Sequence, residues 1–335
     1  MGIEENEVSK NAHGGTELVK RGLAERIEKL EPGLLDNFQV ICSRVRELHD
    51  DKIRVYWLHD LPEDPETNHL HDQNSRNRFH HMVFCGEWQY TRYRDYLGIG
   101  YTMDHSVIDN GITPFEWEPK SKEEVRLIYT STPQRGLGIL VPVFSALAEQ
   151  NEVNLHLDVF SSFDIYGWKG GDDKFKELFD RCREHPQITY HGFKPNEIVR
   201  KYLNRAHIFS YPSVWMECNS VATMEAMSAG LIVVTPNYGG LVDTTGKLTM
   251  MYQGDDDPQV HANVFANALQ MAISRVHKPE METYTKYVKT YADTRFNWDT
   301  VTYQWINLLK KLVARYPDAE SRRQANRPLV YNTGG

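Results

Sequence analysis

The sequence predicts an α/β protein made of two Rossmann-like domains, the first of them reduced and less regular than the second. From residue 125 onward, apolar runs of strand length alternate with amphipathic helical stripes, a pattern typical of parallel strands joined by crossover helices. Before residue 112 the same alternation is present but less regular. At 335 residues the chain is long enough for two such domains, each with its own core.

The second domain is expected to be doubly wound. Its predicted strands are the apolar runs 125–129, 153–160, 188–190, 208–211 and 231–234. Residues at helical spacing indicate its helices, namely Phe175, Leu178, Phe179 and Cys182, followed by Phe265, Ala268, Leu269, Ala272, Ile273 and Val276. Ligands of such domains bind beyond the carboxyl ends of the strands, where Arg135 and the turn at Pro212 and Ser213 are expected.

The first domain is expected to contain one long helix and a smaller sheet. A helix over 16–30 is predicted to bury Leu18, Leu23, Ile27 and Leu30. Short strands are predicted at 38–41, 53–58, 82–84 and 106–108.

Turn chemistry divides the chain. Asp109-Asn110-Gly111 favours a turn, and prolines and charged residues follow it, so an interdomain linker is expected near 112–122. We therefore predict a first domain at 1–112, a second at 113–295, a helix within 296–317 and a frayed tail at 318–335. The helix within 296–317 carries the apolar residues Trp305, Leu308, Leu309 and Leu312.

Composition excludes several classes of function. The chain has 40% hydrophobic and 25% charged residues, and a net charge of −8 argues against a surface that binds nucleic acid or anionic lipid. No apolar run approaches the roughly 18 residues that a membrane span requires, and no leader is evident, so a cytoplasmic protein is expected. The four cysteines show no metal-ligand spacing and are expected to be reduced thiols.

The pair Glu217 and Glu225, separated by seven residues, is the most informative feature of the chain. If Asn219 or Ser220 caps the helix that follows, its free N–H groups, beginning with those near Val221, form a seat for a diphosphate. Glu225 could then accept hydrogen bonds from neighbouring hydroxyls such as those of a ribose. Glu217 would face the group that is attached to the far phosphate. The alternative is that both are solvated acids on a surface helix.

Glu-x7-Glu followed by Ala-Met-Ser-Ala-Gly at 226–230 resembles the signature of the retaining glycosyltransferases of family GT4, which have the GT-B fold. Further segments agree with this family in chain order. They are Gly-Gly-Thr-Glu at 14–17, Asp-Asn-Gly-Ile at 109–112, Ser-Thr-Pro-Gln-Arg-Gly-Leu at 131–137 and His-Gly-Phe at 191–193. The resemblance implies two Rossmann-like domains facing a cleft, with the terminal helix crossing back onto the first domain.

The resemblance also assigns roles to single residues. It implies that Arg135 lies on the donor diphosphate, where a cation would neutralise the charge that grows on the leaving nucleotide. Phe193 and Lys194 would lie near the base, and His59 would face the donor sugar or the acceptor. From the residues alone, His59 could equally pair with Asp60 at the end of a strand.

Gly14, Gly15 and Thr130 each allow more than one interpretation. The resemblance implies that Gly14 and Gly15 let the backbone approach the diphosphate. The alternative is that they simply cap the helix that begins at Thr16. Thr130 stands where the family usually carries a second basic residue, for which Lys194 or the helix N-terminus could compensate.

The resemblance implies hexose transfer with retention of anomeric configuration, with a UDP-sugar as the default donor and without cofactor or metal. His69, His71, His80 and His81 suggest a metal site, but nothing in the intervening sequence aligns them. The acceptor is a glycan, a lipid-linked glycan or another hydroxyl compound. Alternatives are a sugar-nucleotide epimerase, and a degenerate GT-B protein that serves as a partner or scaffold.

The family has a strand before the Gly-Gly loop, whereas residues 1–13 of this chain are polar. Either the first sheet lacks this strand or something else supplies it. Because an exposed sheet edge can pair with another chain, a homodimer is expected.

Overall fold

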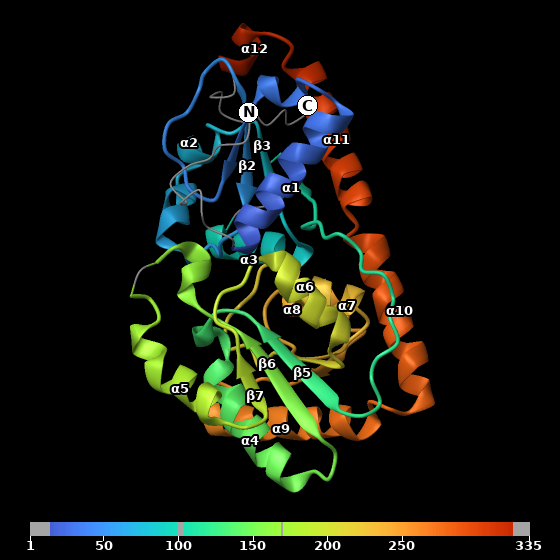
Figure 1. Ribbon diagram of the computed structural model, residues 1–335. Helices are drawn as coiled ribbons and strands as arrows, with labels where there is room; N and C mark the ends of the chain where they lie inside the picture. Colours follow the sequence, from blue (N-terminus) through green and yellow to red (C-terminus); the bar gives the residue numbers. More distant parts are fainter. Residues whose placement is uncertain (1–13, 99–103, 169, 324–335) are drawn as a thin grey trace, which may run out of the picture. The chain divides into compact units, whose positions relative to one another are not determined.

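The computed structural model describes residues 14–98, 104–168 and 170–323 (Figure 1). The chain forms two compact units. Unit 1 contains Leu18–Gly111 and the chain from Trp298 onward, and unit 2 contains Ile112–Asn297 together with residues 14–17. The expectation that residues 1–13 supply no strand lies outside the described residues.

Unit 1 contains a four-stranded parallel sheet in the order β1-β2-β3-β4. Its elements are α1 (Gly15–Leu30), η1 (Leu34–Asn37), β1 (Phe38–Cys42), β2 (Ile53–Leu58), η2 (Pro65–His71), α2 (Gln73–Arg76), β3 (His81–Phe84), α3 (Glu87–Leu97), β4 (His105–Val107), α11 (Trp298–Arg315) and α12 (Ala319–Arg323). The strand order follows the chain order, so each crossover joins neighbouring strands. The predicted strands are all present, and each end is displaced by at most one residue.

Helix α1 buries two of the four residues predicted, Leu23 and Ile27. Val19, Leu23 and Ile27 are buried, whereas Leu18 is only half-buried and Leu30 is 60% exposed. Spacing of four residues puts Val19, Leu23 and Ile27 on one stripe, and Leu30 lies at the end of the helix, beyond that stripe.

Helices α11 and α12 belong to unit 1. The ring of Trp305 on α11 packs edge-on against Trp57 of β2, with ring centroids 4.9 Å apart. Residues 319–323 form α12 where a frayed tail was expected, so that expectation is wrong for these residues. Arg322 donates to Asp51 O at 3.0 Å and to Asn37 Oδ1 at 3.0 Å, and these bonds hold the segment in place.

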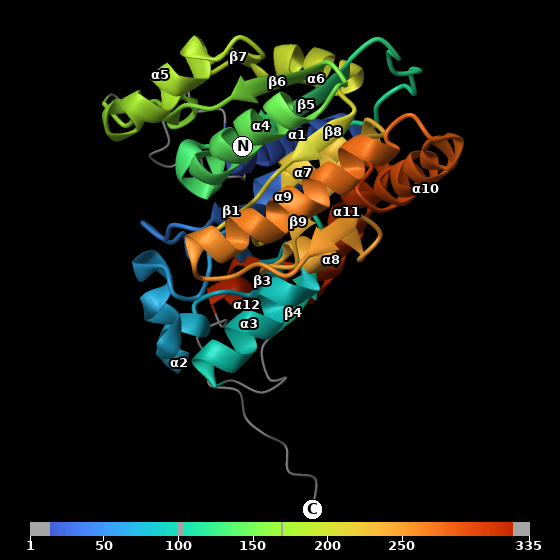
Figure 2. The ribbon, with the colours of Figure 1, turned by 90° about the horizontal axis from the view of Figure 1, so that it is seen from below.

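Unit 2 contains a six-stranded parallel sheet in the order β10-β9-β8-β5-β6-β7. Its elements are β5 (Val125–Thr130), η3 (Pro133–Arg135), α4 (Leu137–Gln150), β6 (Leu155–Phe160), η4 (Phe163–Tyr166), η5 (Asp173–Phe175), α5 (Lys176–Glu184), β7 (Ile188–Tyr190), α6 (Asn196–Arg205), β8 (Ile208–Ser210), α7 (Val221–Ser228), β9 (Ile232–Pro236), α8 (Leu241–Thr245), β10 (Met250–Tyr252), α9 (Pro258–Arg275) and α10 (Pro279–Arg295). Helix α9 packs along β9 and β10 and against α4 (Figure 2).

The order of strands in unit 2 creates a switch point. Strand β5 pairs with β6 on one side and with β8 on the other, so the chain leaves β5 in one direction and returns on the opposite side. The loops that follow β5 and β8 therefore start side by side at the carboxyl edge of the sheet, which is where doubly wound proteins bind ligands.

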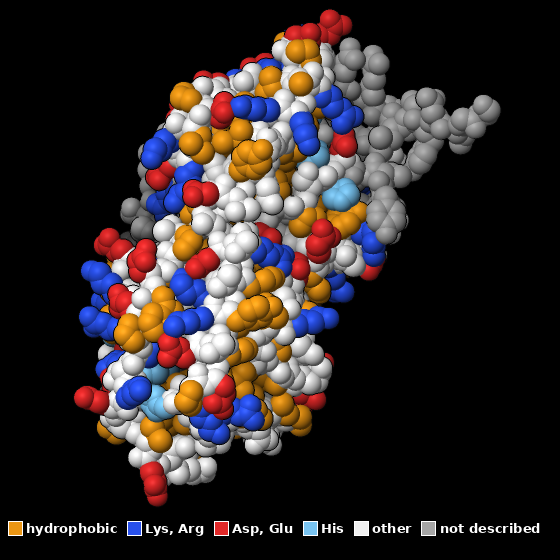
Figure 3. Space-filling view, turned by 90° about the vertical axis from the view of Figure 1, so that its right-hand side faces the viewer, with side chains coloured by type: hydrophobic (Ala, Val, Ile, Leu, Met, Phe, Trp, Pro, Cys, Tyr) orange, Lys and Arg blue, Asp and Glu red, His pale blue; other side chains and the backbone are white. Residues whose placement is uncertain are grey.

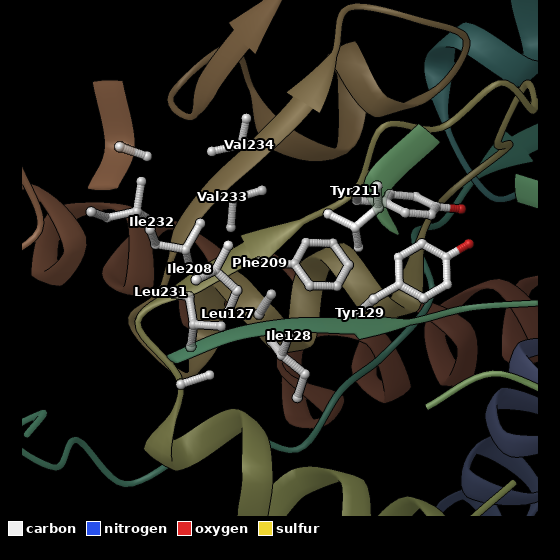
Figure 4. Close-up of a cluster of buried hydrophobic side chains, with 14 of the residues drawn as sticks. Leu127, Ile128, Tyr129, Ile208, Phe209, Tyr211, Leu231, Ile232, Val233 and Val234 are labelled. Atoms are coloured by element: carbon white, nitrogen blue, oxygen red, sulfur yellow. The ribbon is translucent and has the colours of Figure 1, made fainter. Parts of the chain in front are cut away.

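The core of unit 2 contains the apolar strand runs together with apolar residues of the helices that pack on them. Leu127, Ile128, Phe209 and Ile232 are almost completely buried, as expected for strands covered on both faces (Figure 4). The predicted strands are present with small shifts at their ends. Strand β10 (Met250–Tyr252) was not predicted.

The segment expected as a linker packs against unit 2. Ile112 N donates to Phe296 O at 2.8 Å, and Phe115 is buried with its backbone N–H donating to Ser228 Oγ at 3.1 Å. These bonds explain why unit 2 begins at Ile112.

Among the described residues, no helix is long and apolar enough to cross a membrane. On the face drawn in Figure 3, Lys and Arg side chains are interspersed with Asp, Glu and hydrophobic side chains.

Candidate functional site

The N-terminus of α7 lies at the end of the loop that follows β8. Ser220 is the N-cap of this helix, and its Oγ accepts from Thr223 N at 3.4 Å and from Thr223 Oγ1 at 3.0 Å. Of the two capping residues considered from the sequence, Ser220 is therefore the cap, and Asn219 is buried just before it. Val221 begins the helix, so its backbone N–H is among those with no partner inside the helix.

Glycines bring the loops at this edge into contact. Gly136 has a φ of +125°, and a Cβ at this position would lie 2.1 Å from Pro212 O. A Cβ on Gly240 would likewise lie 2.1 Å from Cys218 O. Only glycine allows such approaches, which place the loop after β5 against the loop after β8.

Arg135 and Glu217 meet across these two loops. Arg135 Nη1 donates to Glu217 Oε1 at 2.8 Å, and the hydroxyl of Tyr211 donates to the same oxygen. Glu217 is only 8% exposed. Burial is the largest single influence on the pKa of Arg135 and lowers it, but Glu217, Tyr211 and Tyr166 together outweigh burial, so the pKa is raised. Arg135 Nε is buried without a partner among the described residues, so this cation retains a donor for a ligand.

Glu225 belongs to a second cluster, formed by α6 and α7. Arg200 Nη1 donates to Glu225 Oε1 at 2.7 Å, and Asn196 Nδ2 donates to Glu225 Oε2 at 3.0 Å. Each carboxylate oxygen has two lone-pair sites, so each keeps one acceptor site beyond these bonds. Arg200 also donates to Thr113 O at 2.9 Å and lies over the ring of Phe115.

The remaining predicted donor residues lie on separate segments. Phe193 and Lys194 follow β7, and Lys194 is exposed. A Cβ on Gly14 would lie 2.7 Å from Tyr166 Cε1, and one on Gly15 would lie 4.0 Å from Val221 Cγ2. Gly15 therefore lies beside the first residue of α7. Thr130 Oγ1 is buried without a partner among the described residues.

His59 belongs to unit 1 and follows β2. Its Nε2 is buried and has no hydrogen-bond partner among the described residues. Burial, and to a smaller extent the charge of Lys20, lowers the pKa of His59 to about 3. Within the described chain no ion pair joins His59 to Asp60, so the alternative of a strand-end pair is wrong. His59 is an uncharged ring at neutral pH.

The four histidines considered for a metal are used separately. His69 Nδ1 contacts Ser75 Oγ at 2.7 Å, His80 Nδ1 accepts from Arg54 N at 2.8 Å, and His81 Nε2 contacts Ser106 Oγ at 2.9 Å. In the described ranges, no group of three or more His, Cys, Asp or Glu residues could hold a metal ion.

A cavity of about 490 Å³ opens elsewhere on unit 2, over the first residues of β5 and β6. Asp158 on its floor accepts from Arg126 Nη1 at 2.9 Å and pairs with His191 Nε2 at 2.8 Å. None of the predicted donor residues lines this cavity. The switch point is therefore the better candidate site, because it combines the helix N-terminus with Arg135 and Glu217.

Part of the chain is similar in sequence to known proteins. Residues 125–271 match the family model described as glycosyl transferases group 1. The O-antigen chain mannosyltransferase B of Escherichia coli is 24% identical over 185 residues, which cover 55% of this chain and 45% of that protein. The chain spans less than half the length of the curated relatives it matches.

Solved structures match almost the whole chain. The crystal structure of Anabaena Alr3699/HepE in complex with UDP and glucose matches with a TM-score of 0.67 and 16% identity, over 92% of this chain and 98% of that one. A glycosyltransferase from Rickettsia africae matches with a TM-score of 0.65 and 15% identity, over 93% and 84% of the two chains.

These matches define the class of protein: the chain has the α/β GT-B fold of the glycosyltransferases that it resembles. More particularly, residues 125–271 are similar to the group 1 glycosyltransferases, whose family model they match. This segment contains Arg135, Glu217, Glu225 and α7.

Proposed function

We propose that this protein is a retaining glycosyltransferase of the GT4 type, which transfers a hexose from a nucleotide diphosphate sugar to a hydroxyl acceptor without a metal ion. The observation that carries the proposal is the pairing of Arg135 with Glu217 beside the N-terminus of α7, at the switch point of a group 1 glycosyltransferase segment.

The diphosphate binds at the N-terminus of α7, beside Asn219, Ser220 and Val221, together with Arg135. Such a seat combines a helix dipole with a fixed cation, and both stabilise the charge that develops as the glycosidic bond breaks. Gly14 and Gly15 let backbone approach the phosphates. Because Thr130 supplies no second cation, Arg135 and the helix carry most of this charge.

The rest of the donor is recognised by the two carboxylates and by the loop after β7. Glu225, oriented by Arg200 and Asn196, accepts hydrogen bonds from the ribose through its remaining lone pairs. Phe193 and Lys194 contact the base. Glu217 orients the hydroxyls of the sugar, and His59, as a neutral ring, contacts the sugar or the acceptor.

The proposed chemistry retains the anomeric configuration. The acceptor hydroxyl attacks from the side on which the nucleotide leaves, and a phosphate oxygen of the leaving group takes its proton. The protein supplies position and charge rather than a covalent nucleophile.

UDP is the proposed nucleotide because the Anabaena structure was solved with UDP and glucose. The acceptor is a glycan, a lipid-linked glycan or another hydroxyl compound. We also propose a homodimer, which the molar mass in solution tests directly.

A turnover assay tests the proposal. The protein is incubated with UDP-hexoses, with and without a chelator, and released UDP and sugar products are measured. We expect release of UDP and formation of an α-configured product from an α-configured donor. The chelator should change neither. Arg135→Met should reduce turnover by about two orders of magnitude or more, as the loss of one such charge contact does elsewhere.

The alternatives give different outcomes. An epimerised nucleotide sugar formed without acceptor would indicate an epimerase. Failure to bind any nucleotide would indicate a degenerate protein that serves as a partner or scaffold, an alternative that Thr130 favours.

A further inference from the structure

We infer that Tyr211 is a positioning residue for the proposed transfer, because its hydroxyl and Arg135 together occupy one oxygen of the Glu217 carboxylate and leave the other oxygen for the donor sugar. The inference rests on the proposed function and names a residue that sets how the sugar is held.

The hydrogen bonds from Arg135 and Tyr211 to Glu217 converge on a single atom. Arg135 Nη1 donates to Oε1 at 2.8 Å, and Tyr211 donates to Oε1 as well. Within the described chain, no group donates to Oε2. A carboxylate oxygen has two lone-pair sites, so Oε1 is fully used and both sites of Oε2 are open.

The direction of the Tyr211 hydrogen bond is fixed by its partners. A carboxylate paired with Arg135 can only accept, so the single phenolic proton of Tyr211 points at Glu217. Ser131 Oγ lies 3.4 Å from the same phenolic oxygen and must therefore donate to it. Burial, and then the charge of Glu217, raises the pKa of Tyr211, so this side chain keeps its proton at neutral pH.

Packing holds the hydroxyl in this place. Tyr211 is 1% exposed, and its ring lies 5.5 Å from Phe209 and 5.9 Å from Tyr129. In Figure 4 the hydroxyls of Tyr129 and Tyr211 both point away from the apolar cluster. A polar group carried by a buried, closely packed ring keeps its orientation when a ligand binds.

This arrangement has a consequence for the donor sugar. With Oε1 occupied, Glu217 accepts from sugar hydroxyls through Oε2 alone, and a site built to bind a hydroxyl rejects an analogue that lacks it. Removing the Tyr211 hydroxyl opens a site on Oε1 and frees the carboxylate to turn. The sugar then loses its fixed orientation, whereas the contacts of the nucleotide remain.

The test compares Tyr211→Phe with Tyr252→Phe. Tyr252 is also buried in unit 2, and its hydroxyl bonds to His261 Nε2 at 2.8 Å, away from Glu217. For each variant and wild type, kcat and KM for UDP-hexose hydrolysis and the Kd of UDP are measured. Tyr211→Phe should lower kcat by about tenfold or more, with the Kd of UDP within about twofold and less discrimination between hexoses. Tyr252→Phe should leave kcat, KM and the Kd of UDP unchanged.

Several results would overturn the inference. An unchanged kcat in Tyr211→Phe, or a loss of UDP affinity that matches the loss of kcat, would show that the hydroxyl does not position the sugar. Equal losses in both variants would mean a structural role only. If wild type neither binds UDP nor hydrolyses a UDP-hexose, the proposed function itself is wrong, and the inference falls with it.

Discussion

Arg135 and Glu217 depend on each other, because each would be a poorly solvated charge without its partner. The Glu217 side chain is 10% exposed and that of Arg135 is 25% exposed. Removing one member of such a pair leaves the other charge uncompensated, whereas removing both leaves an apolar contact.

We therefore expect Arg135→Leu and Glu217→Leu each to lower the free energy of unfolding by about 1–3 kcal/mol. The double variant should lose less than the sum of the single variants, because neither charge is then left alone. Urea unfolding of the four proteins gives this coupling. Strictly additive losses would contradict the pairing.

His59 predicts a dependence of stability on pH. Its folded pKa of about 3 lies below the ordinary value of 6.5, so between these values the unfolded chain binds a proton that the folded chain does not. The free energy of unfolding should therefore fall as the pH is lowered from about 6.5 toward 3, with one such group contributing at most about 1.4 kcal/mol per pH unit.

This dependence is measured by urea unfolding between pH 7 and pH 4. His59→Asn should flatten the curve, whereas His71→Asn, which changes an exposed histidine of the same unit, should not. His80 and His81, whose pKa values are lowered to about 4 by burial, keep part of the slope in both variants. Parallel curves for wild type and His59→Asn would contradict the burial of His59.

Contacts between residues that are far apart in the sequence were not predicted. Arg135 and Glu217 were found from motif and spacing, but their direct contact was not predicted because they are 82 positions apart. Arg200 and Asn196 were missed as partners of Glu225. No local signal could have found them, because α6 and α7 are brought together only by the folded unit.

Among the elements, the turn from β5 into α4 is the most constrained. Gly136 combines a φ of +125° with a carbonyl 2.1 Å from where a Cβ would stand. Gly138, two residues later, lies inside α4, and a Cβ placed there would meet no other part of the fold within 4 Å.

These two glycines should respond in opposite ways to alanine. Gly136→Ala should destabilise the protein by at least about 1–3 kcal/mol through backbone strain alone and should reduce donor turnover, since the loop carrying Arg135 must move. Gly138→Ala should be neutral or stabilise by about 0.5–1 kcal/mol, because alanine favours the helix. Thermal unfolding distinguishes them, and a tolerated Gly136→Ala would contradict the close approach of the two loops.

Most strands were predictable from the sequence. They follow from apolar runs, because parallel strands are buried on both faces. Strand β10 and helix α12 were not predicted. The errors at Leu18 and Leu30 of α1 arise because several apolar residues offered alternative stripes and only packing within the fold selects one.

For the whole molecule, the sequence predicted the two-sheet α/β architecture, and similarity to solved GT-B structures confirms it. The alternation of strands and helices sufficed for this, because few topologies satisfy parallel, right-handed crossovers. The identities of nucleotide, sugar and acceptor depend on side chains of several distant segments and so cannot be derived from any one motif.

The most direct test of the account is a thermal-shift panel of UDP, GDP and ADP with wild type, Glu225→Gln and Glu282→Gln. The last variant is the matched control, because Glu282 is an exposed acid of unit 2 that pairs with Lys286. A ligand at a hundred times its Kd stabilises by about 2.7 kcal/mol. We predict that one nucleotide raises the Tm of wild type and of Glu282→Gln but not of Glu225→Gln. No shift with any nucleotide, or equal shifts in all three proteins, would contradict a donor site that uses Glu225.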